Sequence, residues 1–209
     1  MKLAVFGASG RTGQHIVRQA LEAGHEVAAL VRNPSKLNFS HERLHITQGN
    51  VQNVANVETV IAGVDAVLST LGPTNNTADH QVTKGTQNIL VAMKKHGVRR
   101  LVISAGAGVG DPNDKPTLIH KFFGLLVKVL SRNAYEDMMQ VVGVVRQSDV
   151  DWVIVRVPRL TDAPATGSLK VGYVGKDIGT QLSRADMAMF MLQQLESNTN
   201  LRQAPAISN

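Results

Sequence analysis

The stretch Lys2-Leu-Ala-Val-Phe-Gly-Ala-Ser-Gly-Arg-Thr-Gly-Gln14 decides the fold of this 209-residue chain. Its first half is a short apolar run typical of a buried strand, and glycines follow at positions 7, 10 and 13. The next segment, Ile16–Leu21, carries its apolar residues at helical spacing. Strand, glycine turn and helix in this order indicate a nucleotide site more strongly than the glycines would alone.

Each glycine has a physical role in such a turn. Gly7 allows a sharp exit from the strand, Gly10 lets the backbone approach a pyrophosphate, and Gly13 lets the helix pack tightly on the sheet. The first N–H groups of the helix then face the phosphates, and the helix dipole favours their charge. The alternative is a glycine turn without a ligand. The expected cofactor contacts in this loop are Gly7, Ser9, Gly10, Arg11, Thr12 and Gly13.

The composition fits one globular α/β domain that spans residues 1–209, since 43% of residues are hydrophobic and 18% are charged. The absence of cysteine excludes disulfides and thiolate chemistry. The net charge of +6 suits phosphorylated or carboxylated ligands, whereas 4% aromatic residues and scattered basic residues argue against nucleic acid. The apolar N-terminus is needed as a strand, and no uncharged apolar run is long enough to span a bilayer. We therefore expect a cytoplasmic protein without membrane partners, either a monomer or a weak homo-oligomer.

Strand and helix signals alternate along the rest of the chain. The predicted strands are Glu26–Val31, Leu44–Thr47, Ala66–Thr70, Arg100–Ser104, Asp151–Val155, Leu169–Val174 and Ala204–Ile207. The predicted helices are Val54–Ile61, His80–Lys95, Ala134–Gln147 and a last one that a Ser183–Asp186 capping box opens and that reaches Leu195. Alternating units of this kind require a parallel sheet with helices on both faces, so the predicted class is an α/β, doubly wound parallel sheet.

The segment 106–133 breaks this alternation. Gly108–Pro116 has the composition of a loop, and Leu118–Leu130 is apolar with a few basic residues. We expect a helix at Leu118–Leu130 whose apolar face packs on the body of the protein. The alternatives are a mobile cover over the ligand cleft and, less favoured, a helix on a membrane surface.

The end of the second strand indicates which dinucleotide binds. An NAD site usually has an acid here for the ribose hydroxyls, but this chain has Arg32. A guanidinium cannot accept a hydrogen bond from a 2′-hydroxyl, and it pairs well with a 2′-phosphate. Arg11 and Lys36 are placed to reach the same phosphate, unless all three are solvated surface cations. The sequence therefore predicts NADPH rather than NADH.

The carboxyl ends of the other strands supply further candidates, because ligands of doubly wound sheets bind there. Asn50 is expected at the adenine edge, and the Ser104 hydroxyl beside the nicotinamide, unless local backbone satisfies it. The cofactor contacts predicted from strand ends are Asn50, Val51, Thr70, Leu71, Gly72, Ser104, Ala105 and Pro158. The candidate substrate contacts are Arg159, Leu160 and His120.

Other chemistries lack their residues. The histidines show no metal-ligand spacing, and no nucleophile elbow or GK[ST] loop occurs. Tyr135 is followed four positions later by Met139, so the chain lacks the tyrosine–lysine pair that delivers a proton to a developing alkoxide. This argues against alcohol chemistry and favours acceptors whose reduced form takes its proton from solvent.

The motifs GASGRTG, LVRNPSKL, QGNV, STLG, LVISAGAG and WVIVRVPRLTD occur in this order along nearly the whole chain. In this combination the sequence resembles the atypical short-chain dehydrogenase/reductase group of the NmrA-like superfamily, above all its biliverdin-IXβ reductase/flavin reductase branch. The resemblance implies a Rossmann fold with a small C-terminal substrate lobe and with lid or substrate regions around 106–133 and 157–182. It also assigns the active-site serine to Ser104 and the 2′-phosphate arginine to Arg32.

The resemblance implies an NADPH-dependent reductase that transfers hydride to a flat acceptor, such as a flavin (FMN or riboflavin) or a linear tetrapyrrole (biliverdin). Two departures weaken the likeness, because Asn50 stands where the group usually has Asp, and Val142 stands near the place of a histidine. The alternatives are a non-catalytic NmrA-like NADP(H) redox sensor and an NADPH quinone reductase.

Overall fold

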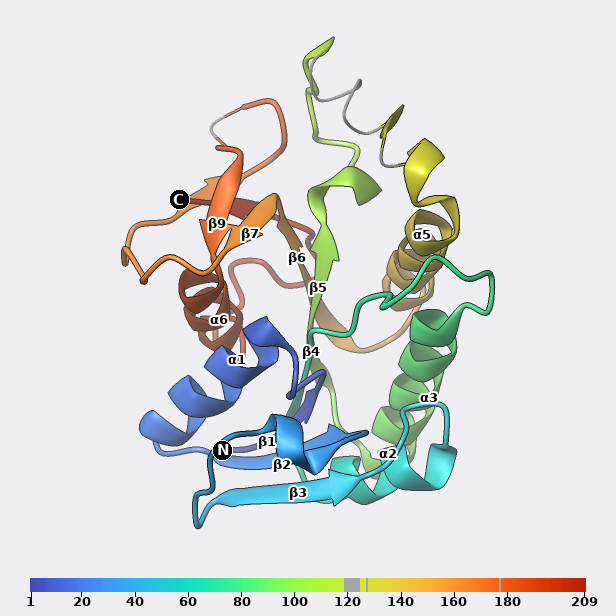
Figure 1. Ribbon diagram of the computed structural model, residues 1–209, viewed down its shortest axis with the longest axis vertical. Helices are drawn as coiled ribbons and strands as arrows, with labels where there is room; N and C mark the ends of the chain where they lie inside the picture. The colour runs from blue at the N-terminus through green and yellow to red at the C-terminus, as the bar shows by residue number, and fades with distance from the viewer. Residues whose placement is uncertain (119–124, 127, 177) are drawn as a thin grey trace.

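The computed structural model describes residues 1–118, 125–126, 128–176 and 178–209. An eight-stranded sheet runs through the middle of the molecule in the order β3-β2-β1-β4-β5-β6-β10-β8 (Figure 1). Strands β1 to β6 are parallel, β10 continues parallel to β6, and β8 closes the edge antiparallel to β10. The strands are β1 (Lys2–Phe6), β2 (Glu26–Val31), β3 (Leu44–Gln48), β4 (Ala66–Ser69), β5 (Arg100–Gly106), β6 (Asp151–Val157), β8 (Lys170–Gly172) and β10 (Ala206–Ser208). This arrangement confirms the predicted doubly wound sheet.

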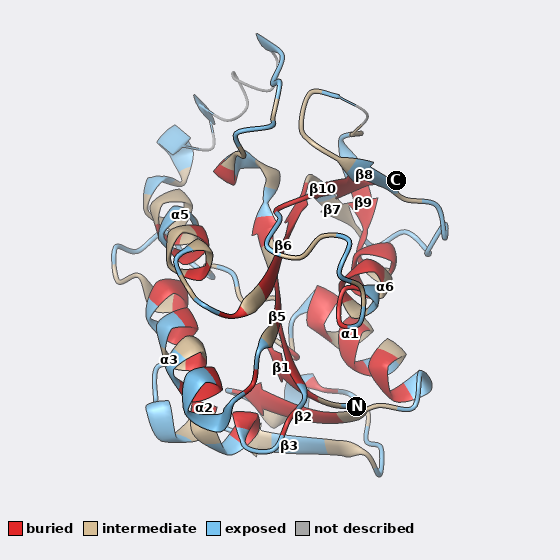
Figure 2. Ribbon diagram, turned by 180° about the vertical axis from the view of Figure 1, so that it is seen from behind, coloured by how far each residue is buried: buried red, intermediate tan, exposed pale blue. Residues whose placement is uncertain are grey.

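Helices cover both faces of the sheet (Figure 1). One face carries α1 (Arg11–Glu22) and α6 (Arg184–Gln193), and the other carries α2 (Val54–Ile61), α3 (Gln81–His96) and α5 (Arg132–Arg146). The alternation along β1 shows why both faces must be covered. Leu3 and Val5 belong to the core under α1 and α6, whereas Ala4 and Phe6 belong to the core under α2, α3 and α5. Figure 2 shows the resulting band of buried residues along the sheet.

The order of the strands places the ligand site. The chain builds β2 and β3 on one side of β1 and then crosses to β4 on the other side. In this register Phe6 lies beside Ser69, so the loops that leave β1 and β4 separate at their carboxyl ends. This is the point at which ligands bind in doubly wound sheets.

Most predicted elements are found within one or two residues of their predicted bounds, and Glu26–Val31 and Val54–Ile61 match them. Strands β5 and β6 each continue two residues further than predicted. The sequence pattern does not indicate β7 (Arg159–Thr161) and β9 (Gln181–Ser183), which pair in parallel as a separate sheet and build the small C-terminal lobe. Three-residue strands are too short to show any hydrophobic period.

The prediction for Leu118–Leu130 lies partly outside the described residues. The apolar residues of this segment that are described are exposed, so for them the expected packing on the body is wrong: Leu118, Leu125, Leu126, Val129 and Leu130. No helix within the described part of the chain is both long and apolar enough to cross a membrane.

Candidate functional site

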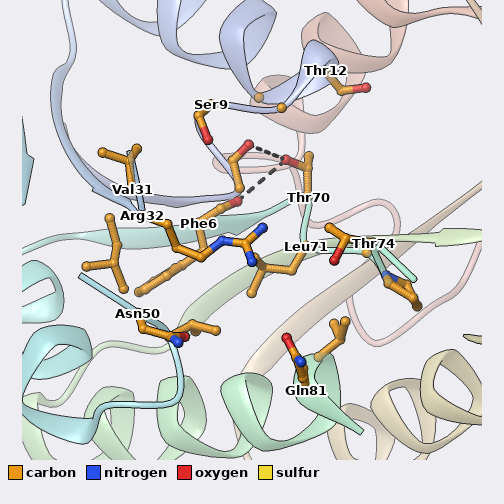
Figure 3. A pocket seen from close by; sticks show the side chains of 18 of the residues that line it. Phe6, Ser9, Thr12, Val31, Arg32, Asn50, Thr70, Leu71, Thr74 and Gln81 are labelled. Atoms are coloured by element: carbon orange, nitrogen blue, oxygen red, sulfur yellow. Dashed lines mark hydrogen bonds between the residues drawn. The ribbon is translucent and has the colours of Figure 1, made fainter. Parts of the chain in front are cut away.

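A cavity of about 630 Å³ opens at the carboxyl ends of β1, β2 and β4. Every cofactor contact predicted from the glycine loop and from the first four strands lines it: Gly7, Ser9, Gly10, Arg11, Thr12, Gly13, Arg32, Lys36, Asn50, Val51, Thr70, Leu71 and Gly72. Figure 3 shows side chains from several of these loops around one hollow. Segments far apart in the sequence therefore form one site.

The glycine loop has the geometry that a bound diphosphate needs. Gly7 has φ +80°, and a Cβ there would lie 2.8 Å from Thr70 Oγ1 and 2.9 Å from the Thr70 carbonyl carbon. A Cβ at Gly13 would lie 2.1 Å from the carbonyl oxygen of Gly7, so only glycine lets α1 start so close to the loop. The loop thus brings a helix N-terminus to the cavity at a distance that side chains would prevent.

The N-terminus of α1 is open to an anion. Its N-cap is Gly10, no side chain caps it, and its first turn contains no acid. The N–H groups of a first helical turn have no partner within the helix, and the helix dipole adds partial positive charge there. These groups can therefore hold a phosphate oxygen.

The N-terminus of α3 also reaches the cavity, but a carboxylate closes it. Asp137 of α5 accepts hydrogen bonds from the backbone N–H groups of Val82 (3.1 Å) and Thr83 (2.9 Å) and from Thr83 Oγ1 (2.6 Å). Asp137 is 4% exposed and lines the cavity. A phosphate would meet a negative charge here, so the two helix ends have different ligand preferences.

Unpaired cations mark the end of β2. Arg32 points into the pocket (Figure 3), and its guanidinium makes no hydrogen bond or ion pair with any described residue. The ammonium group of Lys36, in the short turn Pro34–Lys36, is likewise without a partner in the described part of the chain. Both cations line the cavity and can bind a phosphate group, and neither side chain can accept a hydrogen bond from a ribose 2′-hydroxyl.

Asn50 keeps one half of its amide free. Its Oδ1 accepts the backbone N–H of Gln52 at 3.0 Å, while its Nδ2 makes no hydrogen bond with a described residue. The Nδ2 group remains available to donate to a ring nitrogen of a base.

The residues predicted beyond β4 are placed differently. Ser104, Ala105 and Pro158 do not line the cavity, and Arg159 is exposed outside it, whereas Leu160 does line it. His120 lies outside the described residues. Ser104 is half-buried near the end of β5, beside Val155, and its hydroxyl makes no hydrogen bond with a described residue. Local backbone therefore does not satisfy this serine.

Val142 is buried in the core, so the helix presents no proton donor at that position.

Arg184 also belongs to the site, although the sequence patterns do not indicate it. It is 6% exposed and lines the cavity from the C-terminal lobe. Its position just after Ser183 was visible in the capping box, and Ser183 Oγ does accept the N–H of Asp186 at 3.0 Å. The motif gave no signal that the residue inside it faces a ligand site.

A largely buried carboxylate, Asp114, ties the loop after β5 to its neighbours. Asp114 pairs with both guanidinium nitrogens of Arg156 at 2.6 and 2.8 Å and accepts the N–H of Val174 at 2.9 Å. Burial by itself would raise the pKa of Asp114, but Arg156 and the N–H of Val174 outweigh it and lower that pKa below its usual value. The loop after β5 is thereby tied to β6 and to the C-terminal lobe.

Comparison with known proteins agrees with this geometry. A family described as NAD(P)H-binding matches residues 7–198. An uncharacterized chloroplastic protein of Arabidopsis thaliana is 30% identical over 220 residues, which cover 94% of this chain and 74% of that protein. The matches to four other curated relatives span only 32 to 38% of those proteins' own length.

Solved structures share the fold over the whole chain. A short-chain dehydrogenase/reductase from Veillonella parvula, solved in complex with NADP, has a TM-score of 0.81 at 17% identity and covers 100% of this chain and 94% of its own. ChuY from Escherichia coli O157:H7, described as an anaerobillin reductase, has a TM-score of 0.79 at 18% identity and covers 100% of this chain and 97% of its own.

Proposed function

The chain belongs to the NAD(P)H-binding family, and from this premise we propose that it is an NADPH-dependent reductase that transfers hydride to a flat acceptor, a flavin or a linear tetrapyrrole. The observation that carries the choice of NADPH is Arg32. It lines the cavity at the end of β2 without an acidic partner among the described residues, and no acid stands there to bind ribose hydroxyls.

The residues of the cavity fit each part of this cofactor. The glycine loop and the open N-terminus of α1 would hold the diphosphate, Arg32 and Lys36 the 2′-phosphate, and Asn50 the adenine. When bound, NADPH supplies the hydride. The protein would bind and orient the reactants, which accounts for much of the acceleration in such enzymes.

Ser104 is the one hydroxyl that we place beside the reacting groups. Its free Oγ would orient the nicotinamide or the acceptor by a hydrogen bond. Val142 and Met139 occupy positions where a histidine or lysine would be required to deliver a proton, so we propose that the reduced acceptor takes its proton from solvent.

The test is NADPH consumption by the purified protein with FMN, riboflavin, biliverdin or a quinone, with NADH run in parallel. Saturable turnover that prefers NADPH supports the reductase, and the acceptor with the highest kcat/KM identifies the substrate class. The structural neighbour described as an anaerobillin reductase makes the linear tetrapyrrole a first choice among these acceptors. Turnover with the quinone alone would instead assign a quinone reductase.

One observation favours a second candidate, a non-catalytic NADP(H) redox sensor. Ser104, the only predicted catalytic residue, lies outside the cavity that the cofactor contacts of the first four strands line. Tight NADPH binding without turnover on any of the acceptors would support the sensor and contradict the reductase.

A further inference from the structure

Asp162 bridges two arginines that both line the cavity. Its Oδ2 lies 3.1 Å from Nη1 of Arg11, and its Oδ1 lies 2.7 Å from Nη1 of Arg184. Arg11 is the first residue of α1, Asp162 follows β7, and Arg184 is the first residue of α6. The carboxylate therefore joins the glycine loop to the C-terminal lobe.

The half of the bridge within the C-terminal lobe is held in place. Arg184 is almost fully buried, and Gln19 of α1 donates its amide to the carbonyl of Ala185 at 3.0 Å. The segment after Asp162 is fastened where the N–H groups of Thr166 and Gly167 donate to Asp186 at 2.9 and 3.0 Å.

The pairing of β7 with β9 fastens the segment that precedes Asp162. Figure 1 shows α6 and the β7–β9 pair on the same side of the sheet as α1. The carboxylate of Asp162 is thus presented to the glycine loop by a framework that is fixed on both sides of it.

The other half of the bridge is exposed. The side chain of Arg11 is 72% exposed and that of Asp162 is 63% exposed. Such a surface pair is weak, equivalent to at most about a fivefold change in an equilibrium constant. It therefore opens and closes readily, while the pair with the buried Arg184 keeps Asp162 positioned.

We propose that the Arg11–Asp162 pair is a clasp that closes over the diphosphate of the bound dinucleotide and sets the rates at which the cofactor enters and leaves. This rests on the proposed function only in that the ligand is a nicotinamide dinucleotide. A diphosphate held by the glycine loop would lie beside Arg11, and Asp162 links Arg11 to Arg184, which lines the cavity from the C-terminal lobe. The pair must open when the cofactor enters and when it leaves, so the clasp slows both steps.

The decisive variant is the double substitution Arg11→Gln with Asp162→Asn, which breaks the clasp and leaves the net charge unchanged. Stopped-flow mixing with NADPH, without any acceptor, measures kon and koff. The clasp predicts that kon and koff both rise, by up to about fivefold. The matched control replaces Arg99 and Asp151 in the same way, an ion pair of 3.3 Å that lies outside the cavity, and its rates should equal those of the wild type.

The single variant Arg11→Gln distinguishes the clasp from an effect of charge and leaves the Asp162–Arg184 pair intact should the double variant fold poorly. Loss of one positive charge alone would lower kon for an anionic ligand, whereas opening the clasp raises it. Unchanged rates, a lower kon, or a rise in koff alone with a matching rise in Kd would overturn the proposal. The last result would mean that Arg11 contacts the phosphate directly.

Failure of the clasp and failure of the proposed reductase give different results. Binding of NADPH without turnover on any acceptor rejects the reductase and leaves the clasp measurement valid. Normal turnover with wild-type rates in the double variant rejects the clasp alone. A protein that binds neither NADPH nor NADH rejects both.

Discussion

Arg32 illustrates how much a single residue decides about this site. The strand pattern predicts that Arg32 lies at the end of β2. A cation at this position cannot accept the hydrogen bonds of the ribose hydroxyls, which the acid of an NAD site accepts. The structure adds that the guanidinium points into the cavity and has no acidic partner among the described residues. A cation in this setting keeps its full capacity for a phosphate.

Replacement of Arg32 by alanine should therefore weaken NADPH binding by about 10- to 100-fold, the effect of losing charged hydrogen bonds. NADH lacks the 2′-phosphate, so its affinity should change little. Titration of the purified variant with both cofactors measures the two dissociation constants, and Arg99→Ala, outside the cavity, is the control. Equal weakening of both cofactors would contradict the phosphate assignment.

Ser104 should affect turnover more than cofactor affinity, because we propose that its Oγ orients the reacting groups, whereas the proposed phosphate and adenine contacts line the cavity without it. We expect Ser104→Ala to lower kcat roughly tenfold, the loss of one hydrogen bond, with the Kd for NADPH nearly unchanged. Steady-state kinetics and a binding titration on the same preparation separate the two quantities. A large loss of NADPH affinity would show instead that the serine is structural. Ser40→Ala, at an exposed serine outside the cavity, controls for the substitution itself.

At the scale of single elements, the turn between β1 and α1 is tightly constrained. Gly13→Ala should destabilise the protein by about 3 kcal/mol or more, because the new Cβ would lie 2.1 Å from the backbone oxygen of Gly7. Gly143→Ala is the matched control in the interior of α5, where a Cβ meets nothing within 4 Å. It should stabilise the protein by about 0.5–1 kcal/mol.

Denaturant unfolding of the two glycine variants gives both free energies. If Gly13→Ala and the wild type had the same free energy of unfolding, α1 would be able to shift away from the loop without cost. The close approach of α1 to the loop would then not require glycine. The control also shows whether any loss reflects alanine in a helix in general.

The two helix N-termini at the cavity show why an element's role depends on its neighbours. The sequence predicted both helices and placed only α1 at the ligand, whereas the structure brings the N-termini of both to the cavity. The two N-termini differ in whether they can bind an anion, because Asp137 of α5 accepts hydrogen bonds from the N–H groups at the start of α3. That capping residue lies far along the chain from the helix that it caps, so no local motif indicates it.

At the scale of the whole molecule, Arg156 is the side chain that fastens the loops together. It is 0% exposed, pairs with Asp114 through two nitrogens and donates Nε–H to the carbonyl of Ala204 at 2.7 Å. Arg156→Leu should reduce the free energy of unfolding at neutral pH by about 3–5 kcal/mol, because Asp114 is left buried without its cation. Arg99→Leu, which breaks an exposed pair, should cost less than about 1 kcal/mol.

The pH dependence of this difference provides an independent check. The pKa of Asp114 is lowered in the folded protein. The ionised carboxylate therefore contributes fully to the free energy of unfolding at pH values above its usual pKa near 3.8, and this contribution is lost as the pH falls through the lower pKa of the folded state. The stability difference between wild type and Arg156→Leu should therefore shrink in acid. A difference that stays constant down to the acid limit would show that the ion pair is not its source.

The sequence by itself determined the alternation of strands and helices, the glycine turn and the arginine at the end of β2. These features depend on local periodicity, backbone sterics and the charge of one residue, all of which are carried by neighbours in the chain. This is why the predicted cofactor contacts of the first four strands meet in one cavity.

Only the tertiary structure decided which distant charges meet. The bridge from Arg11 through Asp162 to Arg184, the cap of Asp137 on α3 and the pair of Asp114 with Arg156 join residues that are many positions apart. These contacts require distances that the packing of both sheet faces sets, and no local pattern encodes those distances. The three-residue strands of the C-terminal lobe exist for the same reason, because pairing with each other is what defines them.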